Sequence, residues 1–273
     1  MIEKILFLII LLQVDILHAQ KQTLFVVAGQ SNAMGKGDSN LSIMPNEHTA
    51  FEYRFKTNEL IELKDPVGSY ELRFQPASTG SAWPAFAKQY NSQTGSKVII
   101  VQAARNGSSC HYKAELENSG TWDRSGRMPL FDSSITKIKA AIKKTGTPLR
   151  GIIWIQGERD ANAINANELK PAEYKEALVN LISGFRKKLR KIVEIYVVET
   201  GNYIDHPQQG FDAVREIQKQ VSHELEHVHI VYIEAKNFAS MGLMKDQIHY
   251  NQIALNDIGA KVARWIITHE KNR

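Results

Sequence analysis

Cysteine is almost absent from this chain. Its 273 residues include a single one, Cys110. No disulfide can therefore form within the chain, and the fold has to be stabilised by a hydrophobic core. The neighbouring His111 does not make Cys110 a nucleophile, because adjacent side chains rarely face each other and nothing nearby in the sequence would orient the imidazole. We expect an inert cysteine, buried or in a loop.

Internal repeats, low-complexity linkers and a strong excess of one charge are also lacking. Hydrophobic residues make up 43% and charged residues 23% of the chain, which excludes extended disorder. The formal net charge is +5, and the densest basic run, residues 186–191, falls at the end of a predicted helix. Cations suit the dipole there, so we interpret this run as a solvated helix end and expect no nucleic-acid partner.

A run of eight apolar residues, 5–12, follows Lys4 near the N-terminus. It is too short to span a bilayer as a stable anchor, and Ala19 offers a small residue at a cleavage site before Gln20. We interpret residues 1–19 as a secretory signal and residues 20–273 as one domain. The protein is then expected to be secreted or periplasmic, without stable membrane insertion after cleavage; an uncleaved anchor is the alternative.

Short apolar segments rich in β-branched residues predict five strands. They are residues 24–28, 97–102, 151–155, 194–200 and 229–233. Helical periodicity separates them, at residues 135–144, 171–189, 211–225 and 251–269. The alternation predicts a three-layer α/β/α fold whose parallel sheet of about five strands is covered on both faces. Two stretches, 36–81 and 106–134, do not fit the alternation and are expected to form the walls of a site.

A serine follows the first predicted strand directly. The stretch Gly29-Gln30-Ser31-Asn32 ends the apolar residues 24–28. In open α/β sheets this carboxyl end of a strand is where ligands bind. A hydroxyl at that place can attack an acyl carbon if a histidine reaches it. The same residue types are common in ordinary turns, so the stretch alone does not assign a nucleophile.

A histidine and an acid near the C-terminus supply the partners that a serine nucleophile needs. His249 can accept the proton of Ser31, and Asp246, three residues earlier, can hold the imidazole tautomer. Glu158, which follows a different predicted strand, is the alternative for the acid. Together these residues favour acyl transfer through Ser31.

Candidate donors to a developing oxyanion come from three places in the chain. They are the backbone N–H groups of Ser31 and Gly107 and the side-chain amide of Gln156. Glycine at position 107 suits this role because it lets the backbone approach a substrate closely.

At this point the chain resembles the SGNH-type group of sialate O-acetylesterases and acetylxylan esterases, carbohydrate esterase family 6. The matching blocks are Gly29-Gln30-Ser31-Asn32 with Ala33-Met34-Gly35, Trp154-x-Gln156-Gly157-Glu158-x-Asp160, and Asp246-x-x-His249. They occur in the family's order and cover essentially the whole chain after the signal. The second block departs from the family, because Asn106-Gly107 stands where paired glycines are usual, so only Gly107 carries over.

The resemblance implies a flavodoxin-like fold and serine ester hydrolysis without a metal or other cofactor. The implied substrate is an acetylated carbohydrate, whether sialic acid, xylan or a related glycan. Supporting roles fall to Gln30, Asn32, Glu158 and Asp160. The last two are interpreted as groups that orient loops.

Two other functions are weighed against this reading. The segment His223-Glu224-Leu225-Glu226-His227 spells the zinc-hydrolase pattern H-E-x-x-H. It lacks an extension with a third ligand and runs almost at once into a predicted strand, which leaves little helix to carry both histidines. The other alternative is a secreted carbohydrate-binding protein without catalysis, against which the joint presence of Ser31, Asp246 and His249 argues.

Overall fold

A central sheet of seven strands organises the computed structural model, which describes residues 21–189 and 192–270. The predicted signal, residues 1–19, lies outside the described residues. The strands are β1 (Gln22–Gly29), β2 (Ala50–Arg54), β3 (Glu59–Glu62), β4 (Lys97–Ala104), β5 (Leu149–Ile155), β6 (Glu194–Val198) and β7 (Val228–Tyr232). Their order is β3-β2-β4-β1-β5-β6-β7, and all neighbours are parallel except β2 and β3.

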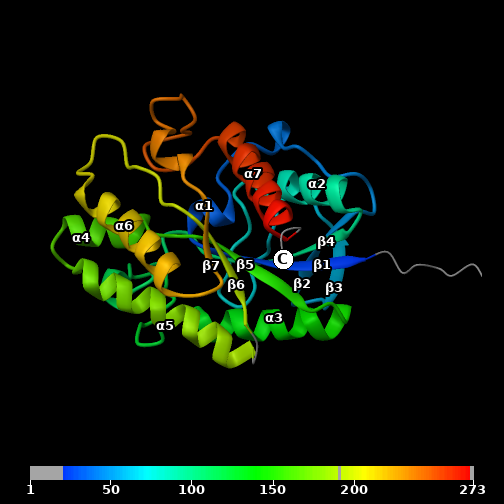
Figure 1. Cartoon of the computed structure of the whole chain (residues 1–273), viewed down its shortest axis with the longest axis horizontal. Coiled ribbons are helices and arrows are strands. Elements are labelled where there is room, and N and C mark those ends of the chain that lie inside the picture. The colour runs from blue at the N-terminus through cyan, green and yellow to red at the C-terminus, as the bar shows by residue number, and fades with distance from the viewer. Residues whose placement is uncertain (1–20, 190–191, 271–273) are drawn as a thin grey trace, which may run out of the picture.

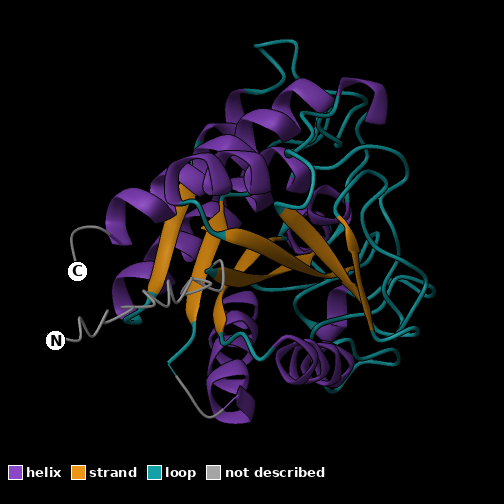
Figure 2. Ribbon diagram, turned by 90° about the vertical axis from the view of Figure 1, so that its right-hand side faces the viewer, coloured by secondary structure: helices purple, strands orange, loops and turns teal. Residues whose placement is uncertain are grey.

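Helices cover both faces of this sheet (Figures 1 and 2). They are α1 (Ser31–Met34), α2 (Trp83–Thr94), α3 (Phe131–Thr145), α4 (Glu158–Asn165), α5 (Pro171–Leu189), α6 (Gln209–Glu224) and α7 (Gln252–Glu270). Figure 1 places α2 and α7 together on one face and α3, α5 and α6 on the other. Within the part of the chain that is described, no helix has the length and apolarity to cross a membrane. The predicted three-layer α/β/α class is confirmed.

Strand β1 lies in the middle of the sheet and contributes to both cores. Leu24 and Val26 belong to the cluster that contains the buried side chains of α3, α5 and α6. Phe25 and Val27 belong to the cluster that contains those of α2 and α7. Successive side chains of a strand point to opposite faces, so the continuous apolar run of β1 is explained by burial on both sides.

The sheet has two strands more than the predicted five, because β2 and β3 lie within residues 36–81. They form an antiparallel hairpin at the sheet edge. Their sequences, Ala-Phe-Glu-Tyr-Arg and Glu-Leu-Ile-Glu, mix apolar and charged residues. Strand β3 is the partly exposed edge strand, and in β2, which pairs with β3 and β4, the buried Glu52 interrupts the apolar residues. Neither strand has a continuous apolar run, so a search for such runs passes over both.

Three helices, α1, α2 and α4, lie outside the predicted helical ranges. Helix α2 has Pro84 in its first turn and ends at Gly95, whose backbone is left-handed (φ 68°); these are ordinary start and stop signals. Helix α4 begins at Glu158, directly after the turn that follows β5, and ends at Asn165.

The ends of β1, β4 and β5 are aligned at one edge of the sheet. Gly29, the last residue of β1, is paired in register with Ala104 on one side and with Ile155 on the other. The three loops that follow these strands therefore begin side by side. Since β1 is flanked by strands reached in opposite directions along the sheet, this edge is a topological switch point, where open α/β sheets form their ligand crevices.

Candidate active site

Ser31 stands where β1 turns abruptly into α1. Gly29 has φ 138°, and a Cβ atom there would lie 2.0 Å from the carbonyl oxygen of Ile155, so only glycine fits. The next residue, Gln30, donates its backbone N–H to that same oxygen at 3.0 Å. Ser31 then begins α1 with 3% of its surface exposed. The predicted nucleophile is thus held at the carboxyl end of the central strand.

Asp246 and His249 form a hydrogen-bonded pair. The imidazole Nδ1 of His249 lies 2.8 Å from Asp246 Oδ2, while Asp246 Oδ1 accepts the backbone N–H groups of Ile248 and His249. Burial alone would raise the pKa of Asp246, but these hydrogen bonds outweigh it and hold the pKa below the ordinary aspartate value. An ionised Asp246 therefore fixes the ring through Nδ1 and leaves Nε2 as the nitrogen for proton transfer.

Asn32, the residue after Ser31, binds the histidine loop on both sides of His249. Its Nδ2 donates to the carbonyl oxygen of Ile248 at 3.3 Å, and its Oδ1 accepts the backbone N–H of Tyr250 at 3.2 Å. These two bonds tie the backbone on either side of His249 to the residue next to Ser31. They set the position of His249 relative to Ser31.

Glu158, at the start of α4, is buried beside this contact. Its Oε1 accepts the Nδ2 of Asn32 at 2.7 Å. Burial dominates and raises the pKa of Glu158, against the opposing effects of the Asn32 hydrogen bond and the nearby His249. The alternative acid of the sequence analysis thus contacts Asn32, whereas Asp246 contacts the imidazole directly.

Gln30, the residue before Ser31, binds the turn that follows β5. Its Oε1 accepts the backbone N–H groups of Gly157 (3.4 Å) and Arg159 (3.2 Å) and lies 3.4 Å from Gln156 Nε2. The two neighbours of Ser31 therefore join it to the other two sequence blocks, Gln30 to the β5 turn and Asn32 to the histidine loop.

The loop after β4 is fastened to the end of β1. Both the backbone N–H of Arg105 (3.2 Å) and the hydroxyl of Ser108 (3.1 Å) donate to the carbonyl oxygen of Gly29. Gly107, between them, has φ 67°, a left-handed conformation that favours glycine. The predicted oxyanion donor of this loop is thereby brought to the same edge as Ser31.

Gln156 is buried among three acceptors. Its Nε2 lies 2.5 Å from Asp160 Oδ2, 3.3 Å from the carbonyl oxygen of Ser108 and 3.4 Å from Gln30 Oε1. An oxyanion bound by this amide would have to share it with these groups. The assignment of Gln156 as an oxyanion donor stays a prediction.

Asp160 joins α4 to the loop after β4. Its carboxylate accepts the backbone N–H groups of Cys110 (2.8 Å) and His111 (2.9 Å) as well as the amide of Gln156. Burial raises its pKa, and the three donors act in the opposite direction. These contacts are those of a residue that orients a loop.

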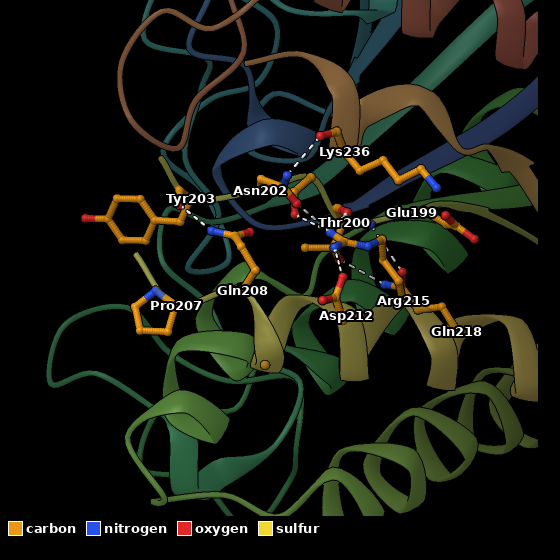
Figure 3. A network of polar contacts seen from close by, with 12 residues as sticks. Glu199, Thr200, Asn202, Tyr203, Pro207, Gln208, Asp212, Arg215, Gln218 and Lys236 are labelled. Carbon is orange, nitrogen blue, oxygen red and sulfur yellow. Dashed lines mark hydrogen bonds and ion pairs between the residues drawn. The ribbon is translucent and has the colours of Figure 1, made fainter. Parts of the chain in front are cut away.

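A polar network centred on Arg215 of α6 lies behind the β5 turn and is not predicted from the sequence (Figure 3). Arg215 is 6% exposed and donates to the carbonyl oxygens of Thr200 and Gly201, to Asn202 Oδ1 and to Asp212 Oδ1. A cation inside the apolar stripe of a helix is the signal that was available, because buried arginine is rare without partners.

Helix α6 also supports the β5 turn directly. The carbonyl oxygen of Gln156 accepts the hydroxyl of Thr200 at 3.1 Å and the Nε2 of Gln218 at 2.9 Å. The backbone N–H of Gly201 donates to the hydroxyl of Tyr250, the residue after His249. Thr200 and Gly201, which follow β6, are therefore hydrogen-bonded to the turn after β5 and to the histidine loop, respectively.

The two histidines of the H-E-x-x-H segment do not share a helix face. Helix α6 ends at Glu224, and His227 lies beyond it with φ 61°. The Nδ1 of His227 is 2.9 Å from Glu194, the first residue of β6. This contact is at the amino end of β6, whereas Ser31 follows the carboxyl end of β1. The geometry that a zinc site on a helix requires is absent at these residues.

Cys110 is buried in the loop after β4, and its burial raises the pKa of the thiol well above the ordinary value. A nucleophilic cysteine needs a lowered pKa. The nearby imidazole of His111 accepts the backbone N–H of Lys113 instead. The structure thus gives the thiol none of the features of a cysteine hydrolase.

Solved structures with the same fold cover nearly the whole chain. A protein of Arabidopsis thaliana superposes with a TM-score of 0.69 at 19% identity, over 91% of this chain and 98% of that one. NanS gives 0.68 at 16% identity, over 93% and 99%. A carbohydrate acetylesterase from Xanthomonas citri gives 0.56 at 17% identity, over 89% of this chain and 55% of that one. These likenesses establish the fold.

No curated protein was found to match the chain. The family description "Carbohydrate esterase, sialic acid-specific acetylesterase" does match, over residues 21–268. That span contains all the residues assigned to the site and confirms the resemblance drawn from the three sequence blocks. The chain therefore belongs to the sialic acid-specific acetylesterase family of carbohydrate esterases and is a carboxylic ester hydrolase.

Proposed function

We propose that this chain is a secreted serine esterase that removes O-acetyl groups from carbohydrates through an acetyl-serine intermediate at Ser31. The observation that carries the proposal is the Asp246–His249 pair, whose atoms Oδ2 and Nδ1 lie 2.8 Å apart. The loop that carries this pair is hydrogen-bonded to Asn32, the residue after Ser31. Acetylated sialic acids fit the family description, and acetylated xylan is the second substrate that the sequence resemblance suggests.

In the first half-reaction, His249 Nε2 accepts the proton of Ser31 Oγ as the oxygen attacks the acetyl carbonyl carbon. The tetrahedral intermediate collapses when the bond to the sugar oxygen breaks, and the imidazolium returns the proton to that oxygen. Asp246 remains ionised and stabilises the imidazolium through Nδ1. The sugar leaves with a free hydroxyl group, and Ser31 carries the acetyl group.

In the second half-reaction, water attacks the acetyl-serine and gives its proton to His249. The intermediate collapses to acetate, and Ser31 Oγ recovers the proton from the imidazolium. The negative charge on the carbonyl oxygen is stabilised in both steps by the N–H groups of Ser31 and Gly107 and by Gln156. Donors of this kind act in the transition state, because the charge develops only there.

The decisive test is Ser31→Ala, assayed for acetate release. Turnover should fall by at least about 10³-fold, as expected when a nucleophile is removed, while the circular dichroism and the melting temperature stay unchanged. Ser240→Ala, on an exposed turn, is the matched control and should keep full activity. A folded Ser31→Ala protein with normal turnover would exclude the serine mechanism.

The substrate is identified by acetate release from a panel of O-acetylated sialic acids and acetylated xylo-oligosaccharides, with and without a chelator. Activity that resists the chelator supports metal-free hydrolysis. Binding of these glycans without any acetate release would instead favour the non-catalytic carbohydrate-binding alternative.

Secretion is tested separately, by mass spectrometry of the protein from its producing cells. A mature chain that begins at or near Gln20 is expected. Retention of residues 1–19 in a membrane fraction would favour the uncleaved anchor.

A further inference from the structure

A groove of about 400 Å³ lies beside the loop that carries His249. Its lining residues are Gly37, Asp38, Leu41, Thr79, Lys245, Asn251, Gln252 and Ile253. In Figure 1 the short helical turn at Ser39–Leu41 lies beside the N-terminal end of α7, where these two parts of the lining meet. The volume is within the range of about 300–1,000 Å³ that is usual for small-molecule sites.

The walls of the groove continue the two segments that carry the catalytic residues. One wall includes residues 37–41, which come after Ser31 and α1 in the chain. The other includes residues 251–253, which come after His249 and begin α7. Lys245 joins them, because its Nζ donates to the carbonyl oxygen of Lys36 at 2.6 Å while its backbone N–H donates to that of His249 at 2.8 Å. The backbone N–H of Asp38 donates to Gln252 Oε1 at 3.2 Å. The groove is therefore built on the same framework as the site.

Two large apolar side chains are exposed at this groove. Leu41 is 57% exposed and Ile253 is 60% exposed. They belong to different walls, Leu41 to the segment after α1 and Ile253 to the first turn of α7. Both side chains line one groove together with polar groups, which is the mixed lining found at small-molecule sites.

The polar groups of the lining include fixed amides and two opposite charges. Asn251 and Gln252 are held by hydrogen bonds to Gly242, Ser81 and other groups of the protein. Asp38 and Lys245 bring one negative and one positive charge. Lys245 Nζ donates to the carbonyl oxygens of Lys36 and Gly37, and Asp38 Oδ1 accepts the backbone N–H of Asn40. A lining with hydroxyl acceptors and donors but no net charge suits a neutral sugar better than an anionic one.

Neither Ser31 nor His249 lines the groove, so an occupant does not present its reacting acetyl group there. We propose that the groove binds the sugar unit adjoining the acetylated one, and that this esterase prefers acetylated oligosaccharides to acetylated monosaccharides. The inference rests on the proposed function. The apolar face of the neighbouring sugar packs on Leu41 and Ile253, and its hydroxyl groups bind Asp38 and Lys245.

The test compares a long and a short substrate from each source: acetylated xylotetraose with acetylated methyl xyloside, and O-acetylated sialyllactose with free O-acetylated sialic acid. p-Nitrophenyl acetate reports the chemistry alone. The test protein is the double variant that combines Leu41→Ser and Ile253→Ser. Ile233→Ser is the matched control, because Ile233 is 54% exposed and lies outside the groove lining.

We expect the wild-type kcat/KM to be higher for the longer member of whichever pair is hydrolysed. The double variant should lower that value roughly tenfold, the scale expected when two partly buried aliphatic contacts are lost. Its activity on the short member and on p-nitrophenyl acetate should not change, and Ile233→Ser should behave as the wild type.

Equal kcat/KM for long and short substrates would overturn the inference, as would an equal loss on both in the double variant. Hydrolysis of p-nitrophenyl acetate without hydrolysis of either glycan pair would also overturn it. Failure of the proposed function itself has a different signature, since no acetyl ester would then be hydrolysed at all.

Discussion

The side chain of Asn32 connects Glu158 to the histidine loop. Its Nδ2 lies 2.7 Å from Glu158 Oε1, and the same side chain binds the backbone on both sides of His249. The carboxylate can only accept, so it turns the amide nitrogen toward itself and leaves Oδ1 for Tyr250 N–H. The buried Glu158 thus orients the asparagine that binds the backbone around His249, the predicted base.

This relationship predicts a rescue. Asn32→Asp places a second carboxylate against Glu158. It should lower kcat about 10²-fold, the scale of a misplaced catalytic group, and it should also lower the free energy of unfolding. Adding Glu158→Gln restores a donor between positions 32 and 158, so the double variant should recover part of both losses. Kinetics and denaturant unfolding of all three variants measure the coupling.

Asn180→Asp, on the exposed side of α5, is the control for the change of side chain and should have no effect. If the losses of Asn32→Asp and Glu158→Gln simply add, the two residues do not act through each other.

Gln156→Ala tests the third oxyanion donor. A donor that acts in the transition state is expected to lower kcat by about 10²–10³, or roughly 2.7–4 kcal/mol, with little change in KM. Steady-state kinetics on one acetylated sugar give this split. The contact with Asp160 provides the rival explanation: a purely structural Gln156 would lower the melting temperature while the remaining folded enzyme kept its kcat.

The pH profile decides between Asp246 and Glu158 as the acid. Hydrogen bonds hold the pKa of Asp246 below its ordinary value, so it stays ionised over the neutral range. Asp246→Asn removes that charge from beside the imidazolium, and the acid limb of kcat/KM should move to lower pH, with reduced turnover from a poorly held tautomer.

Glu158→Gln is the partner measurement. Burial raises the pKa of Glu158, and its oxygen contacts Asn32 rather than His249 Nδ1. We therefore expect this change to move the limb less than Asp246→Asn does. A shift seen only with Glu158→Gln would reassign the acid to the β5 turn.

Arg215→Met should destabilise the protein by about 3 kcal/mol, because it leaves the buried carbonyl oxygens of Thr200 and Gly201 without their donor. Urea unfolding measures the loss. Arg264→Met, on the exposed side of α7, is the matched control and should change the free energy of unfolding by less than about 0.5 kcal/mol. An equally small effect of Arg215→Met would mean that solvent replaces its hydrogen bonds.

The sequence by itself determined the class of the fold and predicted the residues of the site. Apolar runs such as that of β1 and the helical periodicity of α5 are local signals, and each follows from burial of one or both faces. The order of the three blocks then identified the family. Strands β2 and β3 escaped this reading because charged residues, Glu52 in β2 and Glu59 and Glu62 in β3, leave neither with a continuous apolar run.

Only the tertiary structure decided how the site is held together. Gln30 and Asn32 flank Ser31 in the sequence, yet nothing local indicates that Gln30 binds the turn after β5 and Asn32 the backbone around His249. Nothing local indicates the main contacts of Arg215 either, because its partners Thr200, Gly201 and Asn202 precede it by 13 to 15 residues. Such contacts join residues up to 218 positions apart, and their geometry exists only once the parallel strands bring their carboxyl ends to one edge of the sheet.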